Sequence, residues 1–138
     1  DAIVGFPGET DDDFKKTKEA FVESGFEMGY IFKYSERTGT PAAQLENKIP
    51  KAIKEKRNQE LLLLLETQSF VSNQKLLGHS MEILVEGPAR KGDGKLMGRT
   101  RCYRKVIFEG SATLIGSLVD VRIKDVSSST LKAIEISK

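Results

Sequence analysis

Cations alternate with an aromatic residue along a short stretch in the C-terminal half of the chain. The stretch holds Arg99, Arg101, Tyr103, Arg104 and Lys105, and three more cations lie in or beside a glycine-rich loop just before it: Arg90, Lys91 and Lys95. RNA binding needs this mixture, because cations neutralise phosphates while an aromatic or guanidinium plane stacks on an unpaired base. We therefore predict that these residues bind RNA. A basic face that meets only solvent is the alternative.

A second candidate site lies where two predicted strands end. One strand closes with Val4, Gly5, Phe6 and Pro7, and the next closes with Tyr34 and Ser35. Ligands of α/β sheets and barrels sit at the carboxyl ends of strands, and glycine lets a ligand approach the backbone closely. We predict a ligand-binding wall here. The competing interpretation is a strand end followed by a Pro-Gly turn that serves geometry alone.

The composition argues against several other kinds of site. The chain has one cysteine, Cys102, and one histidine, His79, so it cannot form an intrachain disulfide or a Cys/His metal site by itself. We predict no catalytic residue and no metal ligand, and a buried or half-buried Cys102. A single cysteine favours a reducing, cytoplasmic location. The longest apolar run, Leu61 to Leu65, is far shorter than the roughly 20 residues that cross a bilayer, so we expect no membrane association.

Charge is unevenly distributed along the chain. Residues 1–73 carry 10 Lys/Arg and 13 Asp/Glu, whereas residues 74–138 carry 12 and 7, giving net charges of −3 and +5. A basic segment that follows an acidic one favours a polyanionic partner for the basic segment, because phosphate neutralisation releases counterions.

The N-terminal residues predict a strand, a helix and a second strand. Residues 2–6 and 28–34 are β-prone, and between them Thr10 is a plausible N-cap with Asp13 three residues on, while Gly25 is placed to end the helix. A connection of about 20 residues between the strands indicates a right-handed βαβ unit rather than a hairpin. A parallel strand needs neighbours, so we expect the chain to be a piece of a larger protein. We also expect residues 1–48 to be poorly ordered or to associate through their exposed edges.

A long helix and a small barrel are predicted to follow. Residues 51–77 contain no Gly or Pro, and Pro50 suits the first helical turn. We expect this helix to bridge two domains and to bury its leucines against both. Short β-prone segments punctuated by glycine come next, at residues 81–86, 95–100, 103–109, 117–124 and 130–136. Five such strands favour a small barrel. In the fourth strand, the residues expected to point inward are Leu118, Val119, Val121 and Ile123.

Several short motifs, in order along the chain, resemble the C-terminal part of radical-SAM methylthiotransferases. These motifs are Asp1–Thr10 (DAIVGFPGET), Phe32–Ser35 with Arg37, Gly39–Ala42, Leu84–Gly87 and Gly98–Thr100. Within the family, Gly98–Cys102 followed by Lys105-Val106 and Phe108–Gly110 is most similar to the tRNA-modifying, MiaB-type branch.

The resemblance implies a fold for each part of the chain. Residues 1–48 are expected to be the α/β end of a radical-SAM partial, TIM-like barrel, and residues 49–77 a linker helix. Residues 78–138 are expected to be a TRAM domain, a small all-β, OB-like barrel that holds RNA. The wall formed by residues 4–7 with Tyr34 and Ser35 then becomes a binding site for S-adenosylmethionine.

The resemblance also implies an activity for the full-length protein. Enzymes of this branch add a 2-methylthio group to isopentenyl-adenosine beside the anticodon, using S-adenosylmethionine and two 4Fe-4S clusters, so the expected partner is the tRNA anticodon stem-loop. The cluster cysteines of the family, including its CxxxCxxC motif, are missing from this chain. The chain by itself is therefore expected to be inactive and to bind none of these cofactors.

Other functions remain open from the sequence. The related branches modify a ribosomal protein or threonylcarbamoyl-adenosine. A non-catalytic RNA-binding module, or a structural piece held by the leucine-rich helix, would also account for parts of the pattern.

Overall fold

The computed structural model describes residues 1–92 and 94–136. The chain forms two compact units, an N-terminal unit, Asp1–Ser69, and a C-terminal unit, Phe70–Lys138. The division falls inside helix α2, which runs from Lys51 to Gln74. The linker-helix boundaries expected from the sequence therefore remain a prediction.

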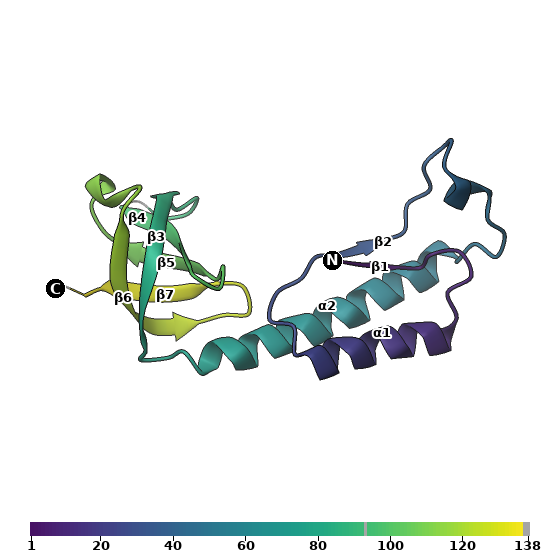
Figure 1. Ribbon diagram of the computed structural model, residues 1–138, viewed down its shortest axis with the longest axis horizontal. Coiled ribbons are helices and arrows are strands. Elements are labelled where there is room, and N and C mark those ends of the chain that lie inside the picture. The colour runs from purple at the N-terminus through teal and green to yellow at the C-terminus, as the bar shows by residue number, and fades with distance from the viewer. Residues whose placement is uncertain (93, 137–138) are drawn as a thin grey trace. The chain divides into compact units, whose positions relative to one another are not determined.

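The N-terminal unit has the predicted strand–helix–strand order (Figure 1). Strand β1 (Ala2–Val4) pairs in parallel with β2 (Ile31–Lys33), and helix α1 (Asp11–Ser24) connects them. The capping box forms as expected, because the Thr10 side chain accepts from the Asp13 N–H at 3.1 Å and the Thr10 N–H donates to Asp13 Oδ2 at 2.9 Å. Gly25 ends α1 in the left-handed conformation, with φ of 61°.

Helices α1 and α2 cover one face of the two strands (Figure 1). The core between them contains Val4, Phe14, Phe21, Leu61 and Leu65. On the strands, Ile3 and Phe32 remain 58% and 52% exposed. Both strands are shorter than predicted. The first ends because Gly5 turns to a φ of +75°, which an extended strand cannot contain.

Helix α2 is shorter than expected, and its leucines are not all buried. It ends at Gln74 rather than near Leu77, and turns lead on to Gly78, which has a φ of +79°. Leu61 is fully buried, but Leu63 is 66% exposed. The expectation that the whole leucine cluster packs against neighbouring elements is therefore wrong for Leu63.

The C-terminal unit is a closed five-stranded barrel, as predicted. Its strands are β3 (Ser80–Pro88), β4 (Lys95–Thr100), β5 (Lys105–Glu109), β6 (Leu118–Val126) and β7 (Leu131–Glu135). They close in the order β3-β4-β5-β7-β6, with only the β5–β7 pair parallel. The described residues also contain two 3-10 segments, η1 (Pro41–Gln44) and η2 (Ala112–Leu114). The most buried barrel residues are Ile83, Val85, Val106, Phe108, Val121, Ile123 and Leu131.

Three sequence-based expectations for the barrel need correction. Leu118 is expected to point inward but is 62% exposed, because Val119, Val121 and Ile123 face the core and Leu118 lies out of phase with them in the alternation of the strand. Tyr103 is expected inside a strand but lies in the β4–β5 turn. Cys102, in the same turn, is exposed rather than buried.

Gly98 shows why one of the sequence motifs requires a glycine. An ideal Cβ at this buried β4 position would lie 2.6 Å from the Leu84 carbonyl oxygen and 3.0 Å from Ile83 Cδ1. Gly98→Ala should therefore destabilise the barrel by about 1–3 kcal/mol through overpacking. Gly87→Ala is the matched control, because nothing lies within 4 Å of its added Cβ. Thermal unfolding of both variants checks this, and equal midpoints would contradict it.

Candidate functional site

The β4–β5 turn holds its aromatic residue in an unusual backbone conformation. Tyr103 has a φ of 66°, a left-handed geometry that bulky side chains rarely adopt. The turn is closed by the Tyr103 N–H, which donates to the Thr100 carbonyl at 2.9 Å, and by the Thr100 N–H, which donates to the Arg104 carbonyl at 3.0 Å. Such strained residues concentrate at functional sites, where the surrounding structure maintains them.

An arginine from β4 covers one face of this tyrosine. The Arg99 guanidinium carbon lies 4.3 Å from the centre of the Tyr103 ring, and Arg99 is also ion-paired with Glu86 at 3.3 Å. Tyr103 nevertheless remains 59% exposed. The ring is thus supported from one side by a cation and is open to solvent on much of its surface, which is the geometry needed to stack an unpaired base.

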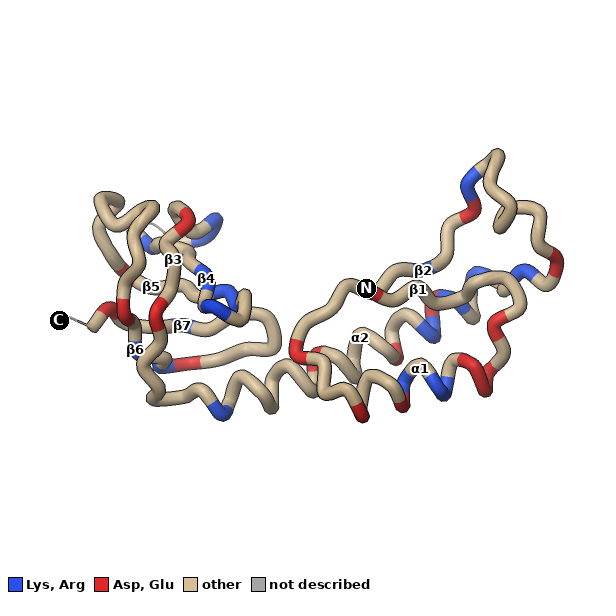
Figure 2. The backbone as a smooth tube through the Cα atoms, viewed as in Figure 1, with Lys and Arg blue, Asp and Glu red and all other residues tan. Residues whose placement is uncertain are grey.

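The other predicted RNA-binding cations occupy different positions around the barrel. The Arg101 side chain is 86% exposed and pairs with Glu82 at 2.8 Å. Strand β4 ends at Thr100, so Arg101 lies in the turn that follows the strand. Lys105 is half-buried at the start of β5, whereas Arg90, Lys91 and Lys95 are exposed around the β3–β4 loop. Figure 2 shows Lys and Arg gathered where the chain leaves β4.

Arg104 is engaged within the protein. Its Nε donates to Asn73 Oδ1 at 3.0 Å and its Nη2 to Ser72 Oγ at 2.9 Å. Asn73 is itself buried and donates to the Ser127 carbonyl at 2.9 Å. Arg104 therefore anchors the turn to the last turn of α2. Its predicted contact with RNA stays a prediction.

Arg104 also affects the neighbouring thiol. Its Nη1 lies 2.8 Å from Cys102 Sγ. Desolvation raises the pKa of Cys102, but the hydrogen bond with Thr100 and the charge and hydrogen bond of Arg104 outweigh it, so the pKa falls below its ordinary value.

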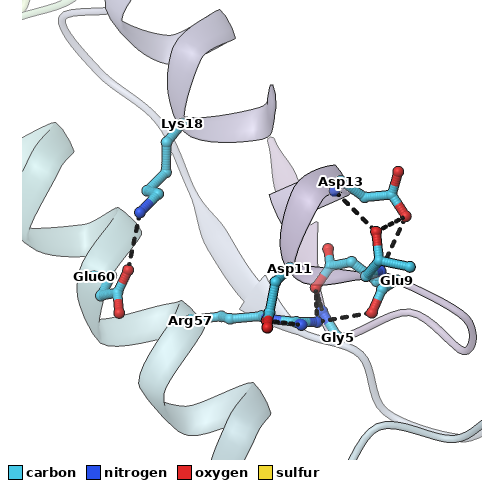
Figure 3. A network of polar contacts seen from close by, with 8 residues as sticks. Gly5, Glu9, Asp11, Asp13, Lys18, Arg57 and Glu60 are labelled. Carbon is cyan, nitrogen blue, oxygen red and sulfur yellow. Dashed lines mark hydrogen bonds and ion pairs between the residues drawn. The ribbon is translucent and has the colours of Figure 1, made fainter. Parts of the chain in front are cut away.

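In the N-terminal unit, a buried arginine that the sequence pattern does not reveal organises the turn after β1 (Figure 3). The side chain of Arg57, on α2, is only 7% exposed. Its Nη1 donates to Glu9 Oε1 at 2.7 Å, and the same oxygen accepts from the Gly5 N–H at 2.9 Å. Its Nη2 donates to Asp11 Oδ1 at 2.8 Å. Burial lowers the pKa of Arg57, but the hydrogen bonds to Asp11 and Glu9 more than compensate and raise it.

The residues predicted to form the ligand-binding wall meet at one edge. The Tyr34 N–H donates to the Val4 carbonyl at 2.8 Å, and the Phe6 and Tyr34 rings pack edge to face with centroids 5.2 Å apart. Gly5 and Pro7 are buried, whereas Ser35 is exposed. The hydroxyl of Tyr34 is buried and has no hydrogen-bond partner among the residues that the structure describes. A buried hydroxyl of this kind calls for an explanation, such as a polar ligand atom that supplies the missing partner.

Residues 1–92 and 94–136 contain neither a metal-binding cluster nor a membrane-spanning helix. Within these ranges no three His, Cys, Asp or Glu side chains are grouped so that they could hold a metal ion. None of the helices in the same ranges is both long enough and apolar enough to cross a membrane.

Comparison with known proteins finds a matching domain and similar proteins. Residues 74–134 match the TRAM domain. Over 131 residues, 95% of this chain, it is 47% identical to a tRNA-2-methylthio-N(6)-dimethylallyladenosine synthase of Desulfitobacterium hafniense (strain Y51) and 51% identical to one of Opitutus terrae (strain DSM 11246 / JCM 15787 / PB90-1). Nearly the whole chain is therefore similar to part of these synthases.

The chain corresponds to a limited part of these relatives. It spans 29% of the D. hafniense synthase and 27% of the O. terrae synthase. The chain is also 45% identical to a synthase of Bordetella avium (strain 197N), in a match that covers 96% of this chain and 28% of that synthase. The residues that match the TRAM domain, 74–134, form the barrel, and they include the stacked pair Arg99 and Tyr103.

Proposed function

We propose that the chain is the C-terminal part of a tRNA methylthiotransferase, in which the barrel holds the tRNA. The observation that carries this proposal is the exposed Tyr103 ring backed by Arg99 on a TRAM barrel, with Arg101 beside it. TRAM domains bind RNA, and the relatives are named for a tRNA product. The predicted contact with the anticodon stem-loop rests on the family resemblance, because the adenosine that such enzymes modify lies beside the anticodon.

The N-terminal unit is proposed to supply part of the wall for S-adenosylmethionine. The residues present fit such a group, because Val4, Gly5, Phe6 and Pro7 offer apolar and backbone contacts beside the orphan Tyr34 hydroxyl. When bound, this cofactor supplies radical chemistry. The network of Arg57 and Glu9 would hold the turn in a fixed shape, and Ser35 would lie at the solvent side of the wall. Since Cys102 is the single cysteine of the chain, the ligands of the two 4Fe-4S clusters would come from elsewhere in the protein.

The substrate is proposed to be isopentenyl-adenosine in tRNA rather than threonylcarbamoyl-adenosine or a ribosomal protein, because the relatives are named for dimethylallyladenosine. The full-length protein, reconstituted with its clusters, should convert isopentenylated tRNA to the 2-methylthio form, as read by mass spectrometry of nucleosides. Modification of a ribosomal protein without modification of the tRNA would overturn this assignment. RNA binding without activity on any of the three substrates would favour a non-catalytic module.

Binding of the 138-residue chain to tRNA should depend strongly on salt. If about four cations contact phosphates, the affinity should fall about fiftyfold between about 50 and 200 mM salt. Arg101→Ala should reduce the slope of log Kd against log salt concentration by about 1. Lys16→Ala is the control, because Lys16 is exposed on α1, in the N-terminal unit. Fluorescence anisotropy gives these slopes, and equal slopes for the two variants would contradict the assigned surface.

A further inference from the structure

The outer face of β4 and β5 combines cations with apolar side chains. Burial alternates along both strands, so that Leu96, Gly98, Val106 and Phe108 point into the barrel. The outward positions pair across the two strands as Arg99 with Lys105, Met97 with Ile107, and Lys95 with Glu109. With distance from the turn, this face thus presents a pair of cations, then an apolar pair, and then Lys95 beside Glu109. In OB-type barrels, the outer face of the second and third strands binds oligonucleotides, and β4 and β5 are the second and third strands of this barrel.

A hollow of about 600 Å³ lies at the end of this face that is distant from the turn. Ile107 of β5 and Ile134 of β7 give it an apolar wall, and Ile134 is 50% exposed. Lys91, Lys95 and Lys132 surround it, together with the carboxylates of Glu109 and Glu135. Of these cations, Lys132 is paired with Asp125 at 3.2 Å.

We propose that this hollow seats one nucleotide of a single-stranded RNA segment that also contacts the Arg99–Tyr103 stack. The inference rests on the proposed RNA-binding function of the barrel and adds a second contact to it. Lys91 and Lys95 neutralise the phosphate, and the base packs against Ile107 and Ile134. Lys91 and Lys95 at the rim supply cations for a phosphate, and the apolar wall complements the face of a base.

The proposal also sets the minimum length of RNA. Lys95 and Arg99 are four residues apart on β4, which corresponds to about 13 Å along a strand. A single strand that reaches from the stack to the hollow must therefore extend over several nucleotides, in keeping with the roughly 4–16 nucleotides bound by one OB-type barrel. A dinucleotide can occupy one contact or the other, but not both.

The test measures binding of the 138-residue chain to fluorescein-labelled oligouridylates of two and eight nucleotides at low salt. Ile134→Glu should weaken binding of the octamer about tenfold, because a carboxylate enters the wall against which the base packs. Leu118→Glu is the matched control, since Leu118 is 62% exposed on β6, outside this face. Circular dichroism melting of both variants verifies that the barrel remains folded, and Lys95→Ala provides a second variant that leaves the apolar wall intact.

The outcomes separate the two proposals. Loss of octamer affinity in Ile134→Glu and Lys95→Ala, but not in Leu118→Glu, supports the hollow as a nucleotide site. Weakened binding in Tyr103→Asn, with unchanged binding in both hollow variants, overturns the hollow and leaves the RNA-binding function standing. If the wild-type chain binds neither the octamer nor tRNA, the proposed function itself fails.

Discussion

Tyr103→Asn should weaken the binding of tRNA by the chain about tenfold while leaving the barrel nearly as stable as before. Stacking of a base on an aromatic side chain contributes about 1–3 kcal/mol, and asparagine cannot replace it. Asparagine adopts the left-handed conformation readily, which relieves about 1 kcal/mol of strain at a φ of 66°. Loss of the Arg99 cation–π contact offsets this gain by about 0.5–1 kcal/mol. Anisotropy titration and thermal melting measure the two effects separately.

Two controls define the Tyr103 prediction. Tyr103→Phe keeps the aromatic plane and should retain most of the affinity. Tyr30→Asn removes a tyrosine that is 64% exposed but lies in the N-terminal unit, so it should leave RNA binding unchanged. Equal affinity for Tyr103→Asn and the wild type would show that the ring is not a stacking platform. A large loss of stability in Tyr103→Asn would show instead that its role is structural.

Arg57→Ala should destabilise the N-terminal unit by about 3 kcal/mol, because it leaves the nearly buried Glu9 carboxylate without its partner cation. Removal of one partner of a buried ion pair costs about 3–5 kcal/mol of stability. We expect the lower value here because Asp11, the second partner of Arg57, is fully exposed. Hydrogen exchange of peptides from residues 1–69, followed in increasing urea, gives the free energy of opening for this unit.

The matched control for Arg57 is Lys18→Ala. Lys18 pairs with Glu60 at 3.1 Å, but both side chains are more than a third exposed. Removal of such a pair should cost less than about 1 kcal/mol. If the two substitutions shift the opening free energy equally, the buried network of Arg57 and Glu9 does not stabilise the turn.

Local signals in the sequence are sufficient to predict most of the regular structure. Thr10, Asp13 and Gly25 define the ends of α1 through short-range hydrogen bonds and a left-handed cap, all of which depend on neighbouring residues. The five barrel strands likewise follow from β-prone segments between glycines. Each of these features is determined within a few residues of the chain.

The features that the sequence does not predict depend on contacts that are distant in sequence or on unfavourable local geometry. Arg57 binds Glu9 across 48 positions, so no local pattern could assign it. The residue type of Arg104 indicates an RNA-binding cation, but it does not reveal that Ser72 and Asn73 lie beside the guanidinium. The sequence predicts strand at Tyr103 because an aromatic residue favours strands and rarely takes a positive φ.

The most direct test of the central claim, that the β4–β5 side of the barrel binds RNA, is an NMR titration of the 138-residue chain with an anticodon stem-loop RNA. We predict that backbone amide shifts change for residues 95–107 and around Lys132 and Ile134, while those of residues 1–69 stay in place. Shift changes confined to the N-terminal unit or to β6, or no changes at RNA concentrations that saturate a basic RNA-binding domain, would contradict the claim.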